Sequence, residues 1–221
     1  MPDSRPLPSG LLPGSPVLTL RGEQPVEALA IGEMLVGVSG AVAPYAPLRF
    51  RRMTRHDLVV RPEARPLRIR ADAIDNGVPM EDLVVAPGQL LLVHEALVPA
   101  WRLEDGAGIA RVQGPLDVIF VRLALDAQDA VLAAGLAVAT DADIRDQGTP
   151  QEPCAPAMEE TALGVLLAGI RLRAEEMGWV TPDPEPVLAP PAGTARDRIL
   201  ASAARLTPPG PELPEGFSEE P

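Results

Sequence analysis

Short apolar runs separated by turn-forming residues fill residues 16–136 and constrain most strongly how this chain can fold. The runs are four to eight residues long, and Gly, Pro, Asp and Asn interrupt them. Runs of this length are typical of β-strands, and we see no helical periodicity in the same stretch. We therefore predict a mainly β fold with many short strands, closed or folded over so that its sheet edges are hidden.

Residues 118–125 give the clearest predicted strand. Alternation along it places Ile119, Val121 and Leu123 on one face and Arg122 on the other.

Two further runs, 83–85 and 90–93, are apolar throughout, which predicts central strands. Pro25 and Pro47 would interrupt a hydrogen-bonded ladder, because proline has no N–H to donate. Their segments are therefore predicted at sheet edges or outside the sheets.

The composition changes after residue 139, and one helix is predicted beyond that point. Its apolar residues recur at spacings of three and four, and Gly178 is a plausible stop. The predicted apolar stripe consists of Leu163, Leu166, Leu167, Ile170, Ala174 and Met177.

We divide the chain into five predicted regions on these patterns. The last region contains ten prolines, so we expect it to be mostly disordered, with a short possible helix at residues 194–206. The regions are an N-terminal extension at 1–9, a β-domain at 10–139, a linker at 140–157, a helix at 158–179 and a Pro-rich acidic tail at 180–221.

The bulk properties exclude several classes of partner. A net charge of −12 disfavours binding to nucleic acid or to an anionic membrane, because Lys and Arg dominate attraction to phosphates. No apolar run approaches the ~18 residues of a membrane span.

The single cysteine, Cys154, excludes an internal disulfide framework. It lies without a basic neighbour, which indicates an unreactive thiol. We expect a cytoplasmic protein, with leaderless export left open.

One basic cluster stands against the acidic balance. Arg49, Arg51, Arg52, Arg55 and His56 are close in sequence and could receive an anion. We favour the simpler interpretation that they form a solvated strand face.

Several segments match the motifs of one known protein family in order and in spacing. Residues 10–15 (Gly-Leu-Leu-Pro-Gly-Ser) resemble the family's Cys-Phe-x-Pro-Gly-Thr start, and residues 25–33 resemble its Pro-Val-Glu-x-Leu-x-x-Gly-Asp element. Residues 65–70 resemble its Arg-Pro-Val-Arg-Ile strand, and residues 82–92 its Asp-Leu-x-Val-Ser-Pro-Asp-His block, followed at 97–100 by Leu-Val-Pro-Ala. Together these segments resemble the bacterial Hint (hedgehog/intein) domain family. The resemblance implies a Hint-type folded-over β-structure with a C-terminal helix.

The resemblance also implies a chemistry, and the matching positions depart from it. Members of the family cleave a peptide bond with a nucleophile at the domain's first residue, where this chain has Gly10. A histidine assists the leaving amide nitrogen, and Gln89 stands at its position. Two later histidines of the family correspond to Arg122 and Gln128. On this resemblance the chain is a degenerate member with no intact catalytic residue.

Two functional hypotheses follow. The first is a Hint-type protein that lacks self-cleavage and acts as a binding or structural module, with an unknown protein partner at the C-terminal helix or tail. The alternative is a self-cleaving domain that uses a non-standard nucleophile such as Ser9. We interpret Ser15 as a turn residue rather than as a nucleophile. The only histidines, His56 and His94, lack further ligands at suitable spacing, so no metal or other cofactor is expected.

Overall fold

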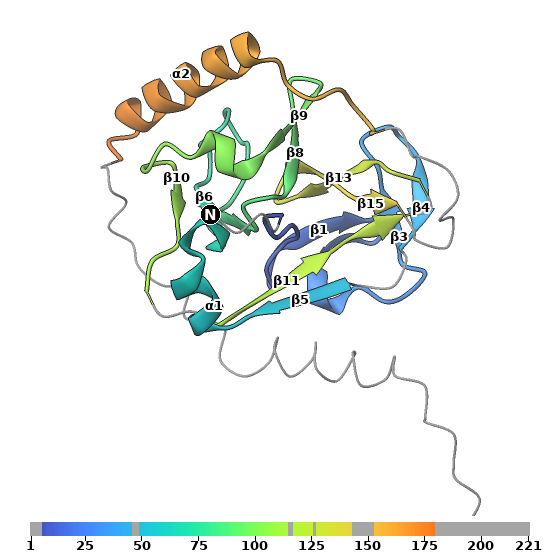
Figure 1. Ribbon diagram of the computed structural model, residues 1–221. Helices are drawn as coiled ribbons and strands as arrows, with labels where there is room; N and C mark the ends of the chain where they lie inside the picture. The colour runs from blue at the N-terminus through green and yellow to red at the C-terminus, as the bar shows by residue number, and fades with distance from the viewer. Residues whose placement is uncertain (1–5, 46–48, 115–116, 126, 143–152, 180–221) are drawn as a thin grey trace, which may run out of the picture.

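The computed structural model describes residues 6–45, 49–114, 117–125, 127–142 and 153–179 (Figure 1). Most of these residues lie in short strands, as predicted. The strands are β1 (Pro16–Thr19), β2 (Gly22–Pro25), β3 (Met34–Val36), β4 (Val42–Pro44), β5 (Arg49–Met53), β6 (Leu67–Ile69), β7 (Leu83–Val85), β8 (Leu90–Val93), β9 (Ala96–Pro99), β10 (Ile109–Arg111), β11 (Val118–Arg122), β12 (Ala124–Leu125), β13 (Ala130–Ala133), β14 (Leu136–Ala139) and β15 (Asp141–Ala142). The helices are α1 (Arg55–Val60) and α2 (Glu160–Glu176), with short 3-10 helices at Val26–Ala28, Pro62–Ala64 and Ala100–Leu103.

The strands form one large sheet and three small ones in the described part of the chain. The large sheet has the order β4-β3-β1-β13-β14-β8-β9, and β2 pairs with β1 as a side branch. The small sheets are β10-β6-β7, β11-β5 and the parallel pair β12-β15. Strands from both ends of the β-region pair together, since β1 lies against β13. The mainly β, folded-over architecture expected from the sequence is confirmed.

Leu11 joins two of the small sheets. It forms antiparallel bridges to Val85 of β7 and to Val121 of β11. With Val121 it exchanges both backbone hydrogen bonds, each 2.8 Å long. The segment around Leu11 therefore acts as a short strand between β7 and β11.

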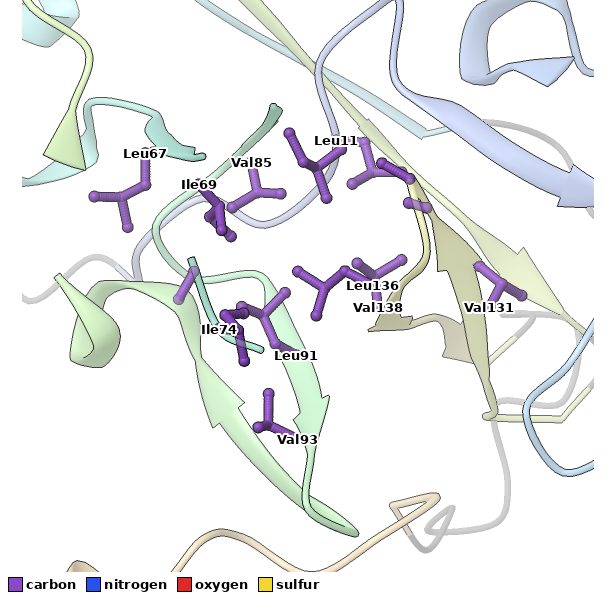
Figure 2. Close-up of a cluster of buried hydrophobic side chains, with 14 of the residues drawn as sticks. Leu11, Leu67, Ile69, Ile74, Val85, Leu91, Val93, Val131, Leu136 and Val138 are labelled. Atoms are coloured by element: carbon purple, nitrogen blue, oxygen red, sulfur yellow. The ribbon is translucent and has the colours of Figure 1, made fainter. Parts of the chain in front are cut away.

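A continuous apolar core connects the sheets. Figure 2 shows side chains from several strands, including those of Leu11, Leu91 and Val138, meeting in this cluster. Val121 and Leu123 belong to the same core and Ile119 packs against it, as the alternation in residues 118–125 predicts. The opposite face is also partly apolar, because Phe120 is fully buried in a second, smaller cluster.

Helix α1 was not predicted, and it changes the interpretation of the basic cluster. Thr54 caps the helix: its side chain accepts a hydrogen bond from the N–H of Asp57, while the Asp57 carboxylate accepts from the N–H of Thr54. The buried side chain of Leu58 anchors the helix on the second cluster. The basic residues are therefore divided between β5 and α1, and the expectation of a single strand face is wrong.

Both runs predicted as central strands have neighbours on their two sides. β8 lies between β14 and β9, so it is central. β7 pairs with β6 on one side, and on its other side the segment of residues 10–12 is bridged to it through Val85 and hydrogen-bonded to Val84 and Ala86, so it too has backbone partners on both sides. Pro25 ends the side strand β2, as expected for a proline; Pro47 lies outside the described residues.

Helix α2 packs on the core, and its prediction is confirmed. The buried residues Leu163, Leu166, Ile170 and Ala174 form its inner face, whereas Met177 is exposed and does not continue the stripe. Gly178 ends the helix with φ +68°.

Polar contacts reinforce the docking of α2 at both of its ends. Leu97 of β9 donates to the Pro156 carbonyl and accepts from the N–H of Met158 just before the helix. Arg102 forms an ion pair with Glu160. Beyond the helix, the Arg70 guanidinium lies 5.3 Å from the ring centre of Trp179.

Parts of the expected C-terminal organisation fall outside the described residues. These are most of the proposed linker, at 143–152, and the whole proposed tail at 180–221, including the possible helix at 194–206. Strand β15 lies beyond residue 139 and pairs in parallel with β12. No helix in the described ranges is long and apolar enough to cross a membrane.

Burial of one face of α2 predicts unequal effects of two truncations. Ile170→Ala should lower the free energy of unfolding by about 2–4 kcal/mol, because its fully buried side chain leaves a cavity. Val165→Ala on the exposed face should change it by less than ~0.5 kcal/mol. Urea unfolding of both variants and the wild type measures the difference. Equal losses would show that α2 does not dock through this face.

The burial of Tyr45 predicts how the protein responds to alkali. Tyr45 is the chain's single tyrosine, is 1% exposed, and burial raises its pKa far above the ordinary value. Its stabilising contribution is complete below the unfolded-state pKa of about 10 and is lost as the pH rises above that value. Phenolate absorbance should therefore appear together with unfolding, whereas the chain in denaturant should titrate near pH 10. Ionisation near pH 10 with native circular dichroism would contradict this burial.

Candidate functional site

The structure brings Gly10 and Gln89 together. The N–H of Gly10 donates a 2.9 Å hydrogen bond to Oε1 of Gln89, although 79 positions separate the two residues. The two positions that the resemblance assigns to one reaction are therefore in direct contact.

The remaining polar atoms of Gln89 are also in use. Its Nε2 group donates to the carbonyl oxygens of Leu90 at 3.0 Å and Ala139 at 2.9 Å. The residue is only 6% exposed. Because a buried unpaired amide costs about 1–3 kcal/mol, these bonds are what make a glutamine acceptable here.

The backbone leaves no room for a side chain at Gly10. Its φ of +124° lies in a region that residues with a side chain rarely adopt. A Cβ atom there would lie 2.7 Å from the carbonyl oxygen of Val121 and 2.9 Å from its carbonyl carbon. These are backbone atoms of β11, held by the exchange of hydrogen bonds with Leu11. The glycine is therefore required by the packing of this segment.

The residues before Gly10 pass close to the turn before Gln89. Gly88 donates its N–H to the carbonyl of Pro8 at 2.8 Å. A Cβ at Gly88 would lie 2.8 Å from that oxygen and 3.0 Å from the Leu7 carbonyl. Ala86 donates to the Gly10 carbonyl at 2.8 Å, so backbone hydrogen bonds fix the segment on both sides of Ser9.

The turn after Leu12 is fixed by a buried carboxylate. Glu27 is 8% exposed and accepts a 2.7 Å hydrogen bond from the N–H of Gly14. Ser15 closes the same turn through its backbone, donating to the Leu12 carbonyl at 3.1 Å.

Arg122 and Gln128 lie on different elements. Arg122, the last residue of β11, forms a 2.5 Å ion pair with Asp141 of β15, and its side chain is 37% exposed. Gln128 lies half-buried between β12 and β13 and makes no hydrogen bond to another described residue. Of the four positions that the resemblance selects, Gly10 and Gln89 are joined by a direct hydrogen bond.

The remaining candidate residues lie on the surface. His94 is exposed on the tight turn between β8 and β9, and His56 is exposed on α1. Cys154 is a free, exposed thiol, and partial burial together with the charge of Asp129 raises its pKa. Within the described ranges, no group of three or more His, Cys, Asp or Glu side chains is arranged to hold a metal ion.

Two features of this site could not be read from local sequence patterns. One is the Val121 carbonyl against Gly10, and the other is the Pro8 carbonyl against Gly88. Both contacts join segments far apart in the chain, so neither strand periodicity nor turn chemistry reports them. The glycines themselves are the only available indication.

Comparison with known proteins identifies the family. A family model described as Hint domain matches residues 9–142, which is more than half of the chain. The chain belongs to the Hint domain family. A search of curated proteins gave no match.

Three solved structures are among those that match part of this chain. The crystal structure of the gp41-1 intein is 10% identical, with 59% of this chain and 98% of that chain covered and a TM-score of 0.42. The crystal structure of the MchDnaB-1 intein is 12% identical, with 60% of this chain and 100% of that chain covered and a TM-score of 0.40. The solution structure of a bacterial intein-like domain from Clostridium thermocellum is 12% identical, with 62% of this chain and 100% of that chain covered and a TM-score of 0.40.

The close approach at Gly10 predicts a large cost for the smallest side chain. Gly10→Ala should lower the free energy of unfolding by about 2–4 kcal/mol, through backbone strain and the clash with Val121. Gly164→Ala is the matched control: this exposed glycine of α2 has open space around it, so the change should stabilise by about 0.5–1 kcal/mol. Denaturant unfolding measures both. A neutral Gly10→Ala would mean that position 10 still accepts a side chain.

Proposed function

We propose that this chain is a Hint-domain protein that does not cleave itself and that serves as a binding or structural module. The observation that carries the proposal is the contact of Gly10 with the Val121 carbonyl, 2.7 Å from where a Cβ would stand. Self-cleavage of this kind needs a hydroxyl or thiol at the first position to attack the preceding carbonyl. Gly10 has no such group, and the space that one would need is occupied by β11.

The direction of the hydrogen bond at Gln89 supports the same proposal. The nitrogen of Gly10 would be the leaving nitrogen of the Ser9–Gly10 bond, and a general acid must deliver a proton to it. Gln89 instead accepts the N–H of that nitrogen, while its own N–H groups point to the Leu90 and Ala139 carbonyls. An amide has no proton to transfer at neutral pH. Gln89 thus stabilises the intact peptide bond.

The outer face of α2 is the surface that we propose for a protein partner. Val165 is 72% exposed and Leu172 is 57% exposed on this face, opposite the residues that pack on the core. Exposed apolar side chains that form a contiguous patch can mark a contact surface. The acidic tail beyond residue 179 is proposed as part of the same partner-facing region.

One observation favours the alternative, in which Ser9 is the nucleophile. Ser9 would attack the carbonyl of Pro8, and that carbonyl already accepts the N–H of Gly88 at 2.8 Å, as an oxyanion would. Proton transfer is what the arrangement lacks. The charged side chains that line the pocket with Ser9 are Arg51 and Arg122, and arginine stays protonated. We therefore rank this alternative second.

Intact-mass measurement of the full chain separates the two hypotheses. After incubation with dithiothreitol or hydroxylamine, the expected result is an unchanged mass, because no ester or thioester forms at position 10. A loss of residues 1–9 would contradict the proposal. A loss of residues 1–8 that Ser9→Ala abolishes would establish the Ser9 alternative instead.

A further inference from the structure

A pocket of about 630 Å³ opens beside the N-terminal segment. Its lining residues are Pro6, Leu7, Ser9, Phe50, Arg51 and Arg122. It thus adjoins the Ser9–Gly10 peptide bond from the side of strands β5 and β11. The volume lies within the range of about 300–1,000 Å³ that is usual for small-molecule sites.

The strand register places two arginines together at this pocket. In the antiparallel pair β5-β11, Phe120 is opposite Arg51 and Arg122 is opposite Arg49. Arg51 and Arg122 are therefore diagonal neighbours on one face of the pair, with Cβ atoms about 7–8 Å apart. The two guanidinium groups carry like charges, so an anion placed between or beside them would be attracted by both.

The acidic groups of the protein balance only part of this charge. Asp141 binds Nη2 of Arg122 at 2.5 Å, which also fixes the position of the guanidinium. The Nε atom of Arg122 is buried and has no hydrogen-bond partner among the described residues. Arg51 is half-buried, and its side chain makes no ion pair or hydrogen bond within the described ranges, although its charge acts on the Asp57 carboxylate of α1. The pocket thus carries two cations and one paired carboxylate.

We propose that this pocket binds a small organic carboxylate, with the carboxylate at Arg51 and Arg122 and its apolar body against Leu7 and Phe50. Guanidinium groups match carboxylates in geometry and form short, charge-assisted hydrogen bonds. Leu7 and Phe50 supply apolar surface in the same pocket. The proposal names a ligand class for the binding module proposed above. It rests on that proposed function only in treating the pocket as a binding site.

Phenylacetate and its neutral analogue phenylacetamide test the proposal on the full-length chain. Backbone amide shifts in two-dimensional NMR should move near Ser9, Arg51 and Arg122 on titration with phenylacetate, and less with phenylacetamide. Arg51→Gln and Arg122→Gln should each weaken phenylacetate binding about tenfold, as expected for a lost charged hydrogen bond. Arg52→Gln is the matched control, because Arg52 is exposed on the same strand and does not line the pocket. This control variant should bind like the wild type.

Several outcomes would overturn the proposal. They are the absence of shifts with phenylacetate, equal affinity for phenylacetamide, or equal weakening by Arg51→Gln and Arg52→Gln. Equal saturation by inorganic phosphate at the same concentration would replace the organic carboxylate by a simple anion. The intact mass of the same samples is recorded in parallel, so that failure of ligand binding is distinguished from failure of the non-cleaving assignment.

Discussion

The insertion of Leu11 between β7 and β11 is the constraint on which the rest of the site depends. Its bridges to Val85 and Val121 join two small sheets that share no direct strand pairing in the described part of the chain. With Leu11 fixed in this way, the preceding residue meets the Val121 carbonyl and must be glycine. Gln89 then takes up the free N–H of Gly10. Its side chain links the N-terminal segment to β8 and β14 through backbone atoms alone.

Much of the architecture follows from patterns that are local in the sequence. The stripe of α2 predicts both the helix and the side that is buried, because residues three and four apart share one face. Alternation predicts which residues of β11 enter the main core. These predictions succeed because a single strand or helix contains all the information that they need.

The errors come from short elements and from contacts between distant segments. Helix α1 has only six residues, too few for a periodic pattern, and its indication was the capping pair Thr54 and Asp57. The register that makes Arg51 and Arg122 neighbours depends on a pairing between residues about 70 positions apart. No local pattern reports such a pairing.

The docking of α2 has a consequence for the order in which the molecule can be completed during synthesis. Leu163, Leu166 and Ile170 contribute to the same core as Leu11 and Val85, yet they leave the ribosome after every described strand. The nascent β-region therefore emerges with an apolar surface that its own later residues must cover. Until residues 160–176 arrive, that surface is open to chaperones or to other nascent chains.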